Sequence, residues 1–578
     1  MDKPDFGRNH RWKQLEHNGV AFPPPHLHRG IAITILGERF VLDRDQEEVI
    51  YAWAKKKDTH YIKDPVFQKN FLDYFKKLLP ERFESMKNIS DIDMGEAFAF
   101  VDQESKTKQA EKERLRLLPK EERKKISMER KAEKEKMKSI YGKAKLDNIE
   151  VDVANWLVEP PGIFMGRGQH PLRGYWKPRV SHNDITLNLS ENSPVPEGPW
   201  KNIVHDHSST WLAAWIEKLT NKRKYVWLHD SASIRQDNDK DKYDKANKLE
   251  NYIDTVDREI INRMINSRDI YKRKVATVCY LIHKLAMRVG DEKDPDEADT
   301  VGASTLRVEH IKFPSTNGNI YIEFNFLGKD SVPWQKTIMV SSVDTKALYE
   351  NLLLFMKNKS DKEEIFQDIT SAKVNAFLRS INRKYLPFLT AKVFRTYIAT
   401  NVVKKSLQKP VISVNRNSSE SKKIYVAKMA NLQAAITCNH KKGVDPNNPT
   451  SKIALEKFQL SVQKKREKIS VLKKELHERK WKSESQRSKA EQRLEKLQFQ
   501  LKLQNETRDY NLGTSLRNYI DPRTFKSWAD YVGLDWTKIY TATLQRKFKW
   551  VEQYTKPQLD KYLKIRTPSA ISETINET

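Results

Sequence analysis

The sequence predicts a multidomain α+β protein. Its 578 residues are too many for a single hydrophobic core. Apolar residues alternate in short strand-like runs in some stretches and recur at helical spacing in others. A heptad pattern over residues 451–510 predicts two coiled-coil helices, which in one chain should fold as an antiparallel hairpin.

The N-terminal third mixes strand and helix patterns. Residues 31–42 alternate apolar and polar side chains on both sides of a glycine, which predicts two short strands and a turn. Helices are predicted over Val49–Lys56 and Pro65–Leu79. Residues 108–140 are dominated by Lys, Arg and Glu, and they predict a solvated helix pair broken near Pro119.

The middle of the chain carries a clear hairpin pattern. Four tryptophans between residues 200 and 227 mark a mixed α/β segment, and from about residue 240 the spacing becomes helical. The turn Asn317-Gly318 is followed by an alternating strand that runs to a second turn, Leu327–Asp330. That second turn leads toward a strand over Thr337–Val340. Lys329 is therefore expected at an exposed hairpin tip.

Composition narrows the class of partner. Lys and Arg number 106 against 77 acidic residues, with a formal net charge of +29, so a polyanion is expected because these cations displace counterions from phosphates. No apolar run approaches 18 residues, and no phosphate-binding loop or paired zinc-ligand spacing occurs. We therefore expect a soluble intracellular protein that uses no membrane, no ATP, no metal and no other cofactor.

Two features leave alternatives open. Cys438 lies two residues before His440, which allows a thiol nucleophile, although a small buried cysteine is favoured. The only other cysteine, Cys279, is distant in sequence, so no disulfide framework is expected. The acidic stretch Asp291–Asp299 leaves a magnesium site open, and a loop is the default interpretation.

One phenol, three cations and one imidazole form a set suited to breaking a phosphodiester without a metal. These residues are Tyr519, Arg307, Lys329, Arg395 and His440. A tyrosine with a free pKa near 10 needs nearby cations to become a nucleophile at neutral pH. The arginines match phosphate oxygens bidentately, the histidine adds a donor, and the lysine is the candidate general acid for the leaving 5′ oxygen.

With these motifs in this order, the chain resembles the eukaryotic type IB DNA topoisomerases. The resemblance extends over nearly the whole chain. It is carried by Trp12–Gly19, Pro160–Phe164, Asp299–Gly302, Phe326–Ser331, Lys538–Tyr540 and Gln545–Phe548 together with the five residues above. It implies that those five are catalytic, with Tyr519 forming a 3′-phosphotyrosine bond before strand rotation and religation. It also implies that Arg167, Asp330 and Asn518 line the DNA cleavage site.

The resemblance further implies a bilobed clamp that closes on double-stranded DNA as a monomer. A mixed α/β cap is expected over residues 1–240 and a mainly α catalytic domain with a β-hairpin over 241–443. A coiled-coil helical hairpin linker is expected over 444–510 and a small α C-terminal domain over 511–578. A nuclear location is implied, and a short N-terminus leaves another compartment or a viral origin open.

The chain departs from the family pattern at two places. The family motif that ends at the nucleophilic tyrosine commonly reads Ser-Lys-Leu-Asn-Tyr. Here the corresponding residues 515–519 read Ser-Leu-Arg-Asn-Tyr, so the cation has moved by one position. Met165 replaces the first arginine of an Arg-Gly-Arg-Gly motif. Two other functions remain open on sequence: a tyrosine recombinase, which shares this chemistry, and a non-catalytic basic DNA clamp or chromatin scaffold.

Overall fold

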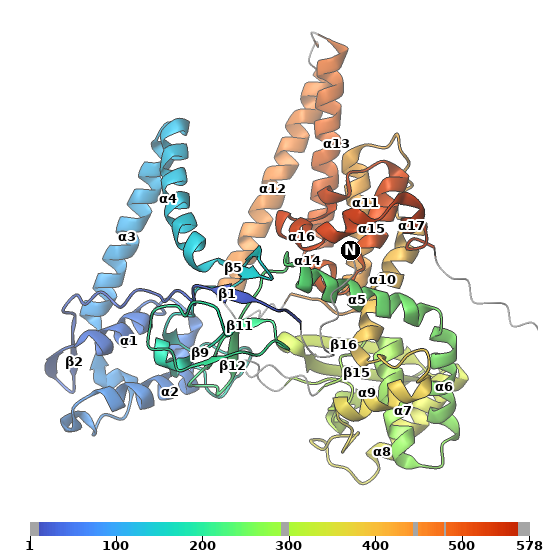
Figure 1. Cartoon of the computed structure of the whole chain (residues 1–578), viewed down its shortest axis with the longest axis horizontal. Coiled ribbons are helices and arrows are strands. Elements are labelled where there is room, and N and C mark those ends of the chain that lie inside the picture. The colour runs from blue at the N-terminus through green and yellow to red at the C-terminus, as the bar shows by residue number, and fades with distance from the viewer. Residues whose placement is uncertain (1–10, 291–299, 443–448, 479–480, 482, 565–578) are drawn as a thin grey trace, which may run out of the picture. The chain divides into compact units, whose positions relative to one another are not determined.

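The computed structural model describes residues 11–290, 300–442, 449–478, 481 and 483–564 (Figure 1). The chain divides into two compact units. The first comprises Met1–Arg235 with the short segments Pro295–Ala298 and Asn448–Thr450, and the second comprises Gln236–Asp294, Asp299–Asn447 and Ser451–Thr578. In the described parts, no helix has the length and apolar character needed to cross a membrane.

In its described residues, the first unit contains several small sheets and the four α-helices α1 to α4. The helices are α1 (Arg44–Ala54), α2 (Pro65–Phe75), α3 (Gly95–Leu117) and α4 (Lys120–Tyr141). The strands are β1 (Leu15–His17), β2 (Ala32–Ile35), β3 (Glu38–Val41), β4 (Ile92–Asp93), β5 (Lys143–Leu146), β6 (Ile149–Asp152), β7 (Gly162–Ile163), β8 (Trp176–Lys177), β9 (Ile185–Asn188), β10 (Asn202–Val204), β11 (Trp211–Ile216) and β12 (Arg223–Trp227). They pair in the orders β3-β2-β4, β1-β5-β6, β10-β9-β11-β12 and β7-β8.

Local chemistry explains where these elements start and stop. The turn between β2 and β3 places Leu36 and Gly37 at φ values of 51° and 88°, the left-handed region that glycine favours. The predicted first helix begins earlier than expected, because Asp43 forms a capping box with Gln46 at its start. The predicted charged pair is present as α3 and α4, which separate at Pro119, but α3 starts at Gly95, well before residue 108.

The second unit is mainly helical. The helix α5 (Ser233–Glu250) begins at the division between the units. The remaining helices are α6 (Ile253–Asn266), α7 (Ile270–Leu285), α8 (Val343–Met356), α9 (Ser371–Ile381), α10 (Ala391–Gln408), α11 (Glu420–Thr437), α12 (Pro449–Glu478), α13 (Glu484–Glu506), α14 (Leu512–Asn518), α15 (Pro522–Val532), α16 (Ala542–Lys547) and α17 (Lys556–Asp560). The strands are β13 (Ile311–Lys312), β14 (Ser315–Thr316), β15 (Asn319–Gly328) and β16 (Val332–Met339).

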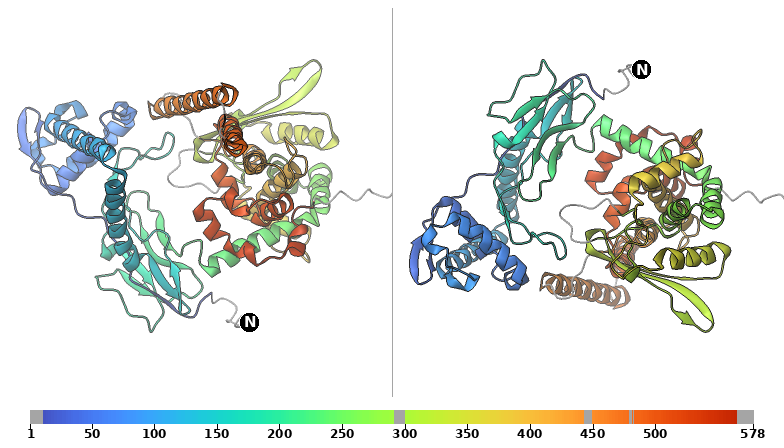
Figure 2. Two further views of the ribbon diagram at one scale, coloured as in Figure 1. Left: turned by 90° about the horizontal axis from the view of Figure 1, so that it is seen from above. Right: turned by 90° about the horizontal axis from the view of Figure 1, so that it is seen from below.

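The hairpin of β15 and β16 is the main β feature of this unit. Its antiparallel register pairs Tyr321 with Met339 at one end and Gly328 with Val332 at the other, so β16 starts before the predicted Thr337. Both views of Figure 2 show the hairpin projecting past the helices as a yellow-green arm. Its buried face joins the core formed with α6 to α9, which fixes the arm at its base.

The helices α12 and α13 are the two long helices of the heptad segment, and they run in opposite directions (Figure 1). Val462 and Leu472 are buried at heptad positions, whereas Leu455 is exposed. Lys465, a cation at a core-type position, donates a hydrogen bond to Gln504 of α13. The C-terminal helices α14 to α16 share a second core with α10 and α11, and Tyr519 belongs to it. This shared core docks the end of the chain on its middle.

Candidate active site

Tyr519 lies in the turn between α14 and α15. Asn511 caps the start of α14 by accepting a hydrogen bond from the Gly513 amide at 3.1 Å. Asp521 caps α15, whose first residue is Pro522. The Tyr519 side chain is 9% exposed. Caps on both sides therefore fix the backbone that carries the phenol.

A buried threonine ties this turn to α10. The Thr400 hydroxyl donates to the carbonyl oxygen of Tyr519 at 3.2 Å and accepts from the amide of Asp521 at 3.1 Å. The Asp521 carboxylate also accepts from the Asn247 side chain of α5 at 2.8 Å. The turn is thus held by two helices that are distant in sequence.

Arg523 also stabilises this turn, through hydrogen bonds from its guanidinium group. Its guanidinium is fully buried and donates to Asp521 at 2.8 Å and to Asp244 at 2.7 Å. It also donates to the hydroxyls of Tyr554 and Tyr562, at 3.1 and 2.9 Å. A buried charge is tolerated when carboxylates and hydrogen bonds satisfy it, as these do.

The Tyr519 phenol is surrounded by two arginines and a histidine. The Arg288 Nη1 donates to the phenolic oxygen at 3.3 Å, and the Arg395 Cζ lies 5.3 Å from the ring centroid. The His440 ring stacks on the phenol ring with centroids 5.2 Å apart. Burial raises the pKa of Tyr519, but the charges of Arg395 and Arg288 outweigh it, so the pKa lies below its usual value. The phenolate is therefore easier to form here than in water.

Arg395 is held rigidly by the ends of two helices. It donates to the carbonyl of Ala286, which follows α7, and to that of Cys438 at 3.1 Å, which follows α11. Helix C-termini attract cations, because their last carbonyls are unpaired. The Nη2 also lies 3.5 Å from the Nε2 of His440. The position of Arg395 is set before any ligand arrives.

His440 is buried and neutral. Burial lowers its pKa to about 3, with further lowering by the charges of Arg395 and Arg288. Its Nδ1 lies 2.7 Å from the hydroxyl of Ser515, a fully buried residue of α14. The imidazole therefore contacts both the arginine of α10 and the helix that leads to Tyr519.

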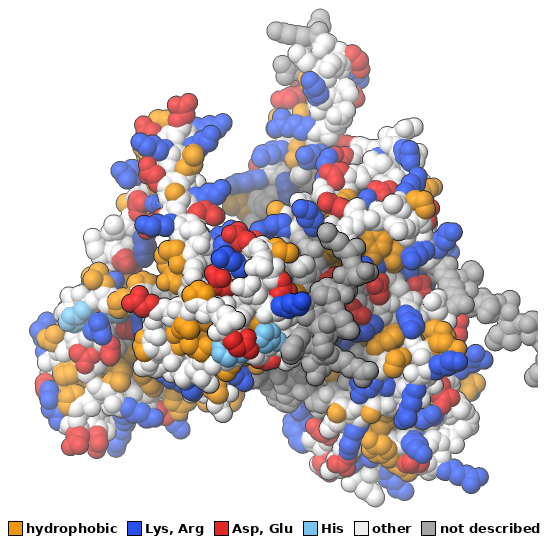
Figure 3. Space-filling model, viewed as in Figure 1, with side chains coloured by type: hydrophobic (Ala, Val, Ile, Leu, Met, Phe, Trp, Pro, Cys, Tyr) orange, Lys and Arg blue, Asp and Glu red, His pale blue; other side chains and the backbone are white. Residues whose placement is uncertain are grey.

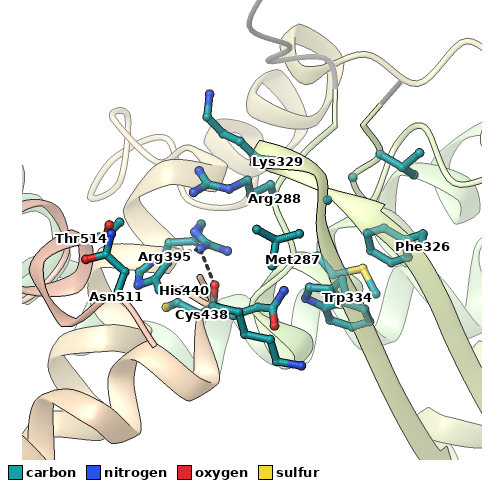
Figure 4. A pocket seen from close by; sticks show the side chains of 16 residues that line it. Met287, Arg288, Phe326, Lys329, Trp334, Arg395, Cys438, His440, Asn511 and Thr514 are labelled. Carbon is teal, nitrogen blue, oxygen red and sulfur yellow. Dashed lines mark hydrogen bonds between the residues drawn. The ribbon is translucent and has the colours of Figure 1, made fainter. Parts of the chain in front are cut away.

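Lys329 and Arg288 line the same cavity as Arg395 and His440. In Figure 4, Arg288 lies between Lys329 and Arg395 along one side of this cavity. Lys329 begins the short 3-10 turn Lys329–Ser331 at the tip of the β15–β16 hairpin, as predicted, but it is half-buried where an exposed residue was expected. The remaining lining residues are Met287, Val301, Gly302, Phe326, Gly328, Val332, Trp334, Cys438, Asn439, Lys441, Asn511 and Thr514.

The backbone around Arg288 is fixed by its contact with the segment that contains Gly302. After α7 ends at Leu285, Ala286 adopts a left-handed φ of 53°. The Arg288 carbonyl then accepts a hydrogen bond from the Ala303 amide at 2.8 Å. A Cβ on Gly302 would lie 2.4 Å from the Cα of Gly290, so only glycine permits this approach. The same segment pairs with the hairpin, because the Val301 amide donates to the carbonyl of Leu327 at 2.9 Å. One short segment therefore fixes Arg288 and the arm that bears Lys329.

Arg307, predicted as one of the five catalytic residues, is not among the described residues that line this cavity. Its Nε donates to Glu309 at 2.8 Å, and its Nη2 lies 3.3 Å from the Nε2 of His310. Hydrogen bonds from Lys362 and Arg307 lower the pKa of Glu309 to about 2, so this carboxylate stays charged beside Arg307. Among the described lining residues of the cavity, Arg288 stands where Arg307 was expected.

The sequence did not predict Arg288 as a site residue, because no distinctive motif surrounds it. It follows the apolar helix pattern that ends at Met287, and Gly290 comes two residues later. Arg307 sits in the more distinctive run Leu306–His310, where Leu306 is fully buried and anchors the backbone. A cation directly after a buried helix and before a glycine was the available signal.

The remaining predicted residues are spread over both units. Asn518 is exposed at the end of α14, next to Tyr519, and the side chain of Asp330 lies outside the described residues. Arg167 is exposed in the first unit, between two glycines with φ values of 64° and 61°. The stretch 291–299, where a magnesium site was left open, also lies outside the described residues.

The cysteine alternative finds no support in the structure. Cys438 is 3% exposed, and burial raises the pKa of its thiol. A thiolate nucleophile is therefore disfavoured, and the small buried cysteine that was favoured on sequence fits. Within the described ranges, no group of three or more His, Cys, Asp or Glu side chains is arranged to hold a metal ion.

Basic side chains are widespread on the surface. Figure 3 shows Lys and Arg over both units on the face in view, interspersed with Asp and Glu. The excess of cations over the whole chain is 29 charges. A broad positive field of this kind attracts a polyanion without selecting its sequence.

Comparison with protein families accounts for most of the chain. Residues 10–228 match the family described as "Eukaryotic DNA topoisomerase I, DNA binding fragment". Residues 231–476 match "Eukaryotic DNA topoisomerase I, catalytic core", and residues 491–560 match "C-terminal topoisomerase domain". The second of these matches contains Arg288, Lys329, Arg395 and His440, and the third contains Tyr519.

Individual relatives agree with the family matches. The chain is 34% identical over 566 residues to DNA topoisomerase 1 beta of Arabidopsis thaliana, covering 93% of this chain and 58% of that protein. It is 34% identical to human DNA topoisomerase 1, covering 70% of that protein, and 33% identical to human "DNA topoisomerase I, mitochondrial", covering 90%. The chain thus spans little more than half of the plant relative and most of the human mitochondrial one. On this similarity and on the motifs and cavity described above, the chain belongs to the eukaryotic DNA topoisomerase I family.

Proposed function

We propose that this protein is a type IB DNA topoisomerase, which relaxes supercoiled double-stranded DNA without ATP. The observation that carries the proposal is the Tyr519 phenol held between Arg288 and Arg395, beside the cavity that Lys329 and His440 line. A phenol activated by two cations is suited to attack phosphorus, and the same cations match the charge that develops on the phosphate oxygens.

The steps follow from the residues. The Tyr519 oxygen forms a bond to the DNA phosphorus and loses its proton to water, while the bond from phosphorus to the 5′ oxygen breaks. Lys329 gives the leaving 5′ oxygen its proton. Arg288 and Arg395 bind the two non-bridging oxygens, and His440 adds a third donor. The reverse reaction reseals the strand after rotation, so the bond energy is kept in the 3′-phosphotyrosine link.

We also propose the larger arrangement that the family resemblance implies. The first unit acts as the cap of a monomeric clamp around duplex DNA, with Arg167, Asp330 and Asn518 near the cleavage site. Residues 241–443, 444–510 and 511–578 act as catalytic domain, linker and C-terminal domain. A nuclear location is proposed, and one relative bears the name "mitochondrial"; imaging of the tagged protein in cells distinguishes these compartments.

The test is relaxation of a negatively supercoiled plasmid in EDTA without ATP. Wild-type protein should relax the plasmid, and denatured reactions should contain DNA with protein on its 3′ end. Tyr519→Phe should bind DNA but neither relax it nor form the adduct. A recombinase would form the adduct without relaxing a plasmid that lacks its sites, and a scaffold would do neither. Full activity of Tyr519→Phe would exclude the proposal.

A further inference from the structure

Ser515 connects the histidine of the site to the turn that carries the nucleophile. Its side chain is fully buried, and its Oγ lies 2.7 Å from the Nδ1 of His440. Its backbone carbonyl accepts from the amides of Tyr519 and Ile520, at 3.0 and 3.1 Å. A single residue of α14 thus contacts His440 through its hydroxyl and the Tyr519 turn through its carbonyl.

The chemistry of the site restricts where the His440 proton can be. The imidazole is buried beside two guanidinium groups, so it is neutral and has one N–H. A phosphate oxygen only accepts hydrogen bonds, so the ring nitrogen that faces it must carry that proton. The nitrogen near the phosphate-binding guanidinium is Nε2, which lies 3.5 Å from Arg395. The Nδ1 must then accept a hydrogen bond.

The Ser515 hydroxyl is the group placed to donate that hydrogen bond. A hydroxyl can donate or accept by rotating about its C–O bond, so it fits either tautomer of the imidazole. Without DNA, Arg395 can donate to Nε2 while the Nδ1 proton points at Ser515. With a phosphate present, the proton is needed on Nε2 and the hydroxyl turns to donate.

We propose that Ser515 is a positioning residue for His440, whose hydroxyl donates to Nδ1 and so holds the proton on Nε2 when a DNA phosphate occupies the site. The inference rests on the proposed strand-cleavage function and adds to it a residue that acts through its hydrogen bond to His440. Because Ser515 lies four residues before Tyr519, docking of α14 places the nucleophile and sets the histidine tautomer together.

The first test measures single-turnover cleavage of a DNA whose cut fragment dissociates. Ser515→Ala should cleave about three- to tenfold more slowly at unchanged DNA affinity, the loss expected for one neutral hydrogen bond. Ser515→Thr, which keeps the hydroxyl, should recover most of the rate. Ser527→Ala, at a buried serine of α15, is the matched control and should cleave like wild type.

A double-mutant cycle separates positioning from a general structural effect. If Ser515 acts through His440, then Ser515→Ala should add no further loss to His440→Ala. Wild-type cleavage by Ser515→Ala, or the same loss in both backgrounds, would overturn the inference. Failure of the proposed function itself looks different, because wild-type protein would then form no adduct with DNA.

The tautomer can also be read directly, without a Ser515 variant. Tyr519→Phe with ¹⁵N-labelled histidine is bound to duplex DNA, and long-range ¹H–¹⁵N spectra identify which ring nitrogen carries the proton. The His440→Gln spectrum assigns the signal. A protonated Nε2 supports the inference, and a protonated Nδ1 in the DNA complex refutes it even if Ser515→Ala fails to fold.

Discussion

Replacing Arg288 and Arg307 in parallel tests the assignment that depends most on the structure. Arg288 donates to the Tyr519 oxygen and lines the cavity, whereas Arg307 is paired with Glu309. Arg288→Ala removes a fixed cationic donor from the developing charge, and losing one such donor costs about 10²–10³-fold in rate, or about 2.7–4 kcal/mol. Arg307→Ala breaks a partly exposed ion pair, worth about 0.2–1 kcal/mol of stability.

The pH dependence gives this prediction a second readout. In Arg288→Ala the phenol stays buried and keeps the charge of Arg395 but loses that of Arg288, so the pKa of Tyr519 should rise. Because the phenolate attacks, the rise in cleavage rate with pH should move to higher pH. Arg288→Lys should fall between wild type and Arg288→Ala, since an ammonium retains the charge but loses the bidentate fork.

The assay is single-turnover cleavage across a range of pH, with DNA affinity measured separately on Tyr519→Phe backgrounds. Arg307→Ala is expected to cleave like wild type and to melt at a slightly lower temperature. A larger loss of cleavage in Arg307→Ala than in Arg288→Ala would refute the reasoning. So would an unchanged pH profile in Arg288→Ala, because the phenol would then not respond to its nearest donor.

Three further changes have defined outcomes. Thr400→Val removes the hydroxyl that bonds the Asp521 amide and the Tyr519 carbonyl. It should lower the free energy of unfolding by about 1–3 kcal/mol, measured by thermal or denaturant unfolding, and slow DNA cleavage. Thr400→Ser, which keeps the hydroxyl, should restore the stability and the cleavage rate. Gly302→Ala forces a Cβ against backbone 2.4 Å away and should destabilise the protein by about 1–3 kcal/mol, with no effect if the contact is absent in solution. Burial lowers the pKa of His17 from 6.5 to about 4, so the folded state binds fewer protons than the unfolded state and stability should fall as pH drops from 6.5 toward 4, by up to about 3 kcal/mol. His17→Gln should flatten that slope in melts recorded across this range, and an unchanged slope would contradict it.

Much of the architecture was predictable because local signals and tertiary packing agree. The Asn317-Gly318 turn takes the positive φ values that its residues favour, and the strand after it alternates buried and more exposed side chains as predicted. The start of α1 was placed too late, because the capping residue Asp43 precedes the apolar pattern that marked the helix. Heptad spacing predicted α12 and α13 but did not predict that Leu455 is exposed.

The site was predictable only where a residue lies in a distinctive local setting. Lys329 at a hairpin tip follows from turn chemistry, and Tyr519 follows from its motif. Arg288 depends on the approach of Gly302 to Gly290, a contact between segments that no local pattern encodes. The partnership of Ser515 with His440 is likewise a contact between segments 75 residues apart.

The anchoring of the Tyr519 turn has a consequence for the fate of a cut strand. Hydrogen bonds from Thr400, Asn247 and Arg523 hold this turn through the Tyr519 carbonyl and the Asp521 carboxylate. In the proposed reaction, the DNA end attached to the phenol is held in place by the protein, and the opposite end is the one that can rotate. Religation then requires the free 5′ end to return to a phosphotyrosine whose position is fixed. Substitutions that remove these hydrogen bonds should therefore leave more DNA strands unsealed.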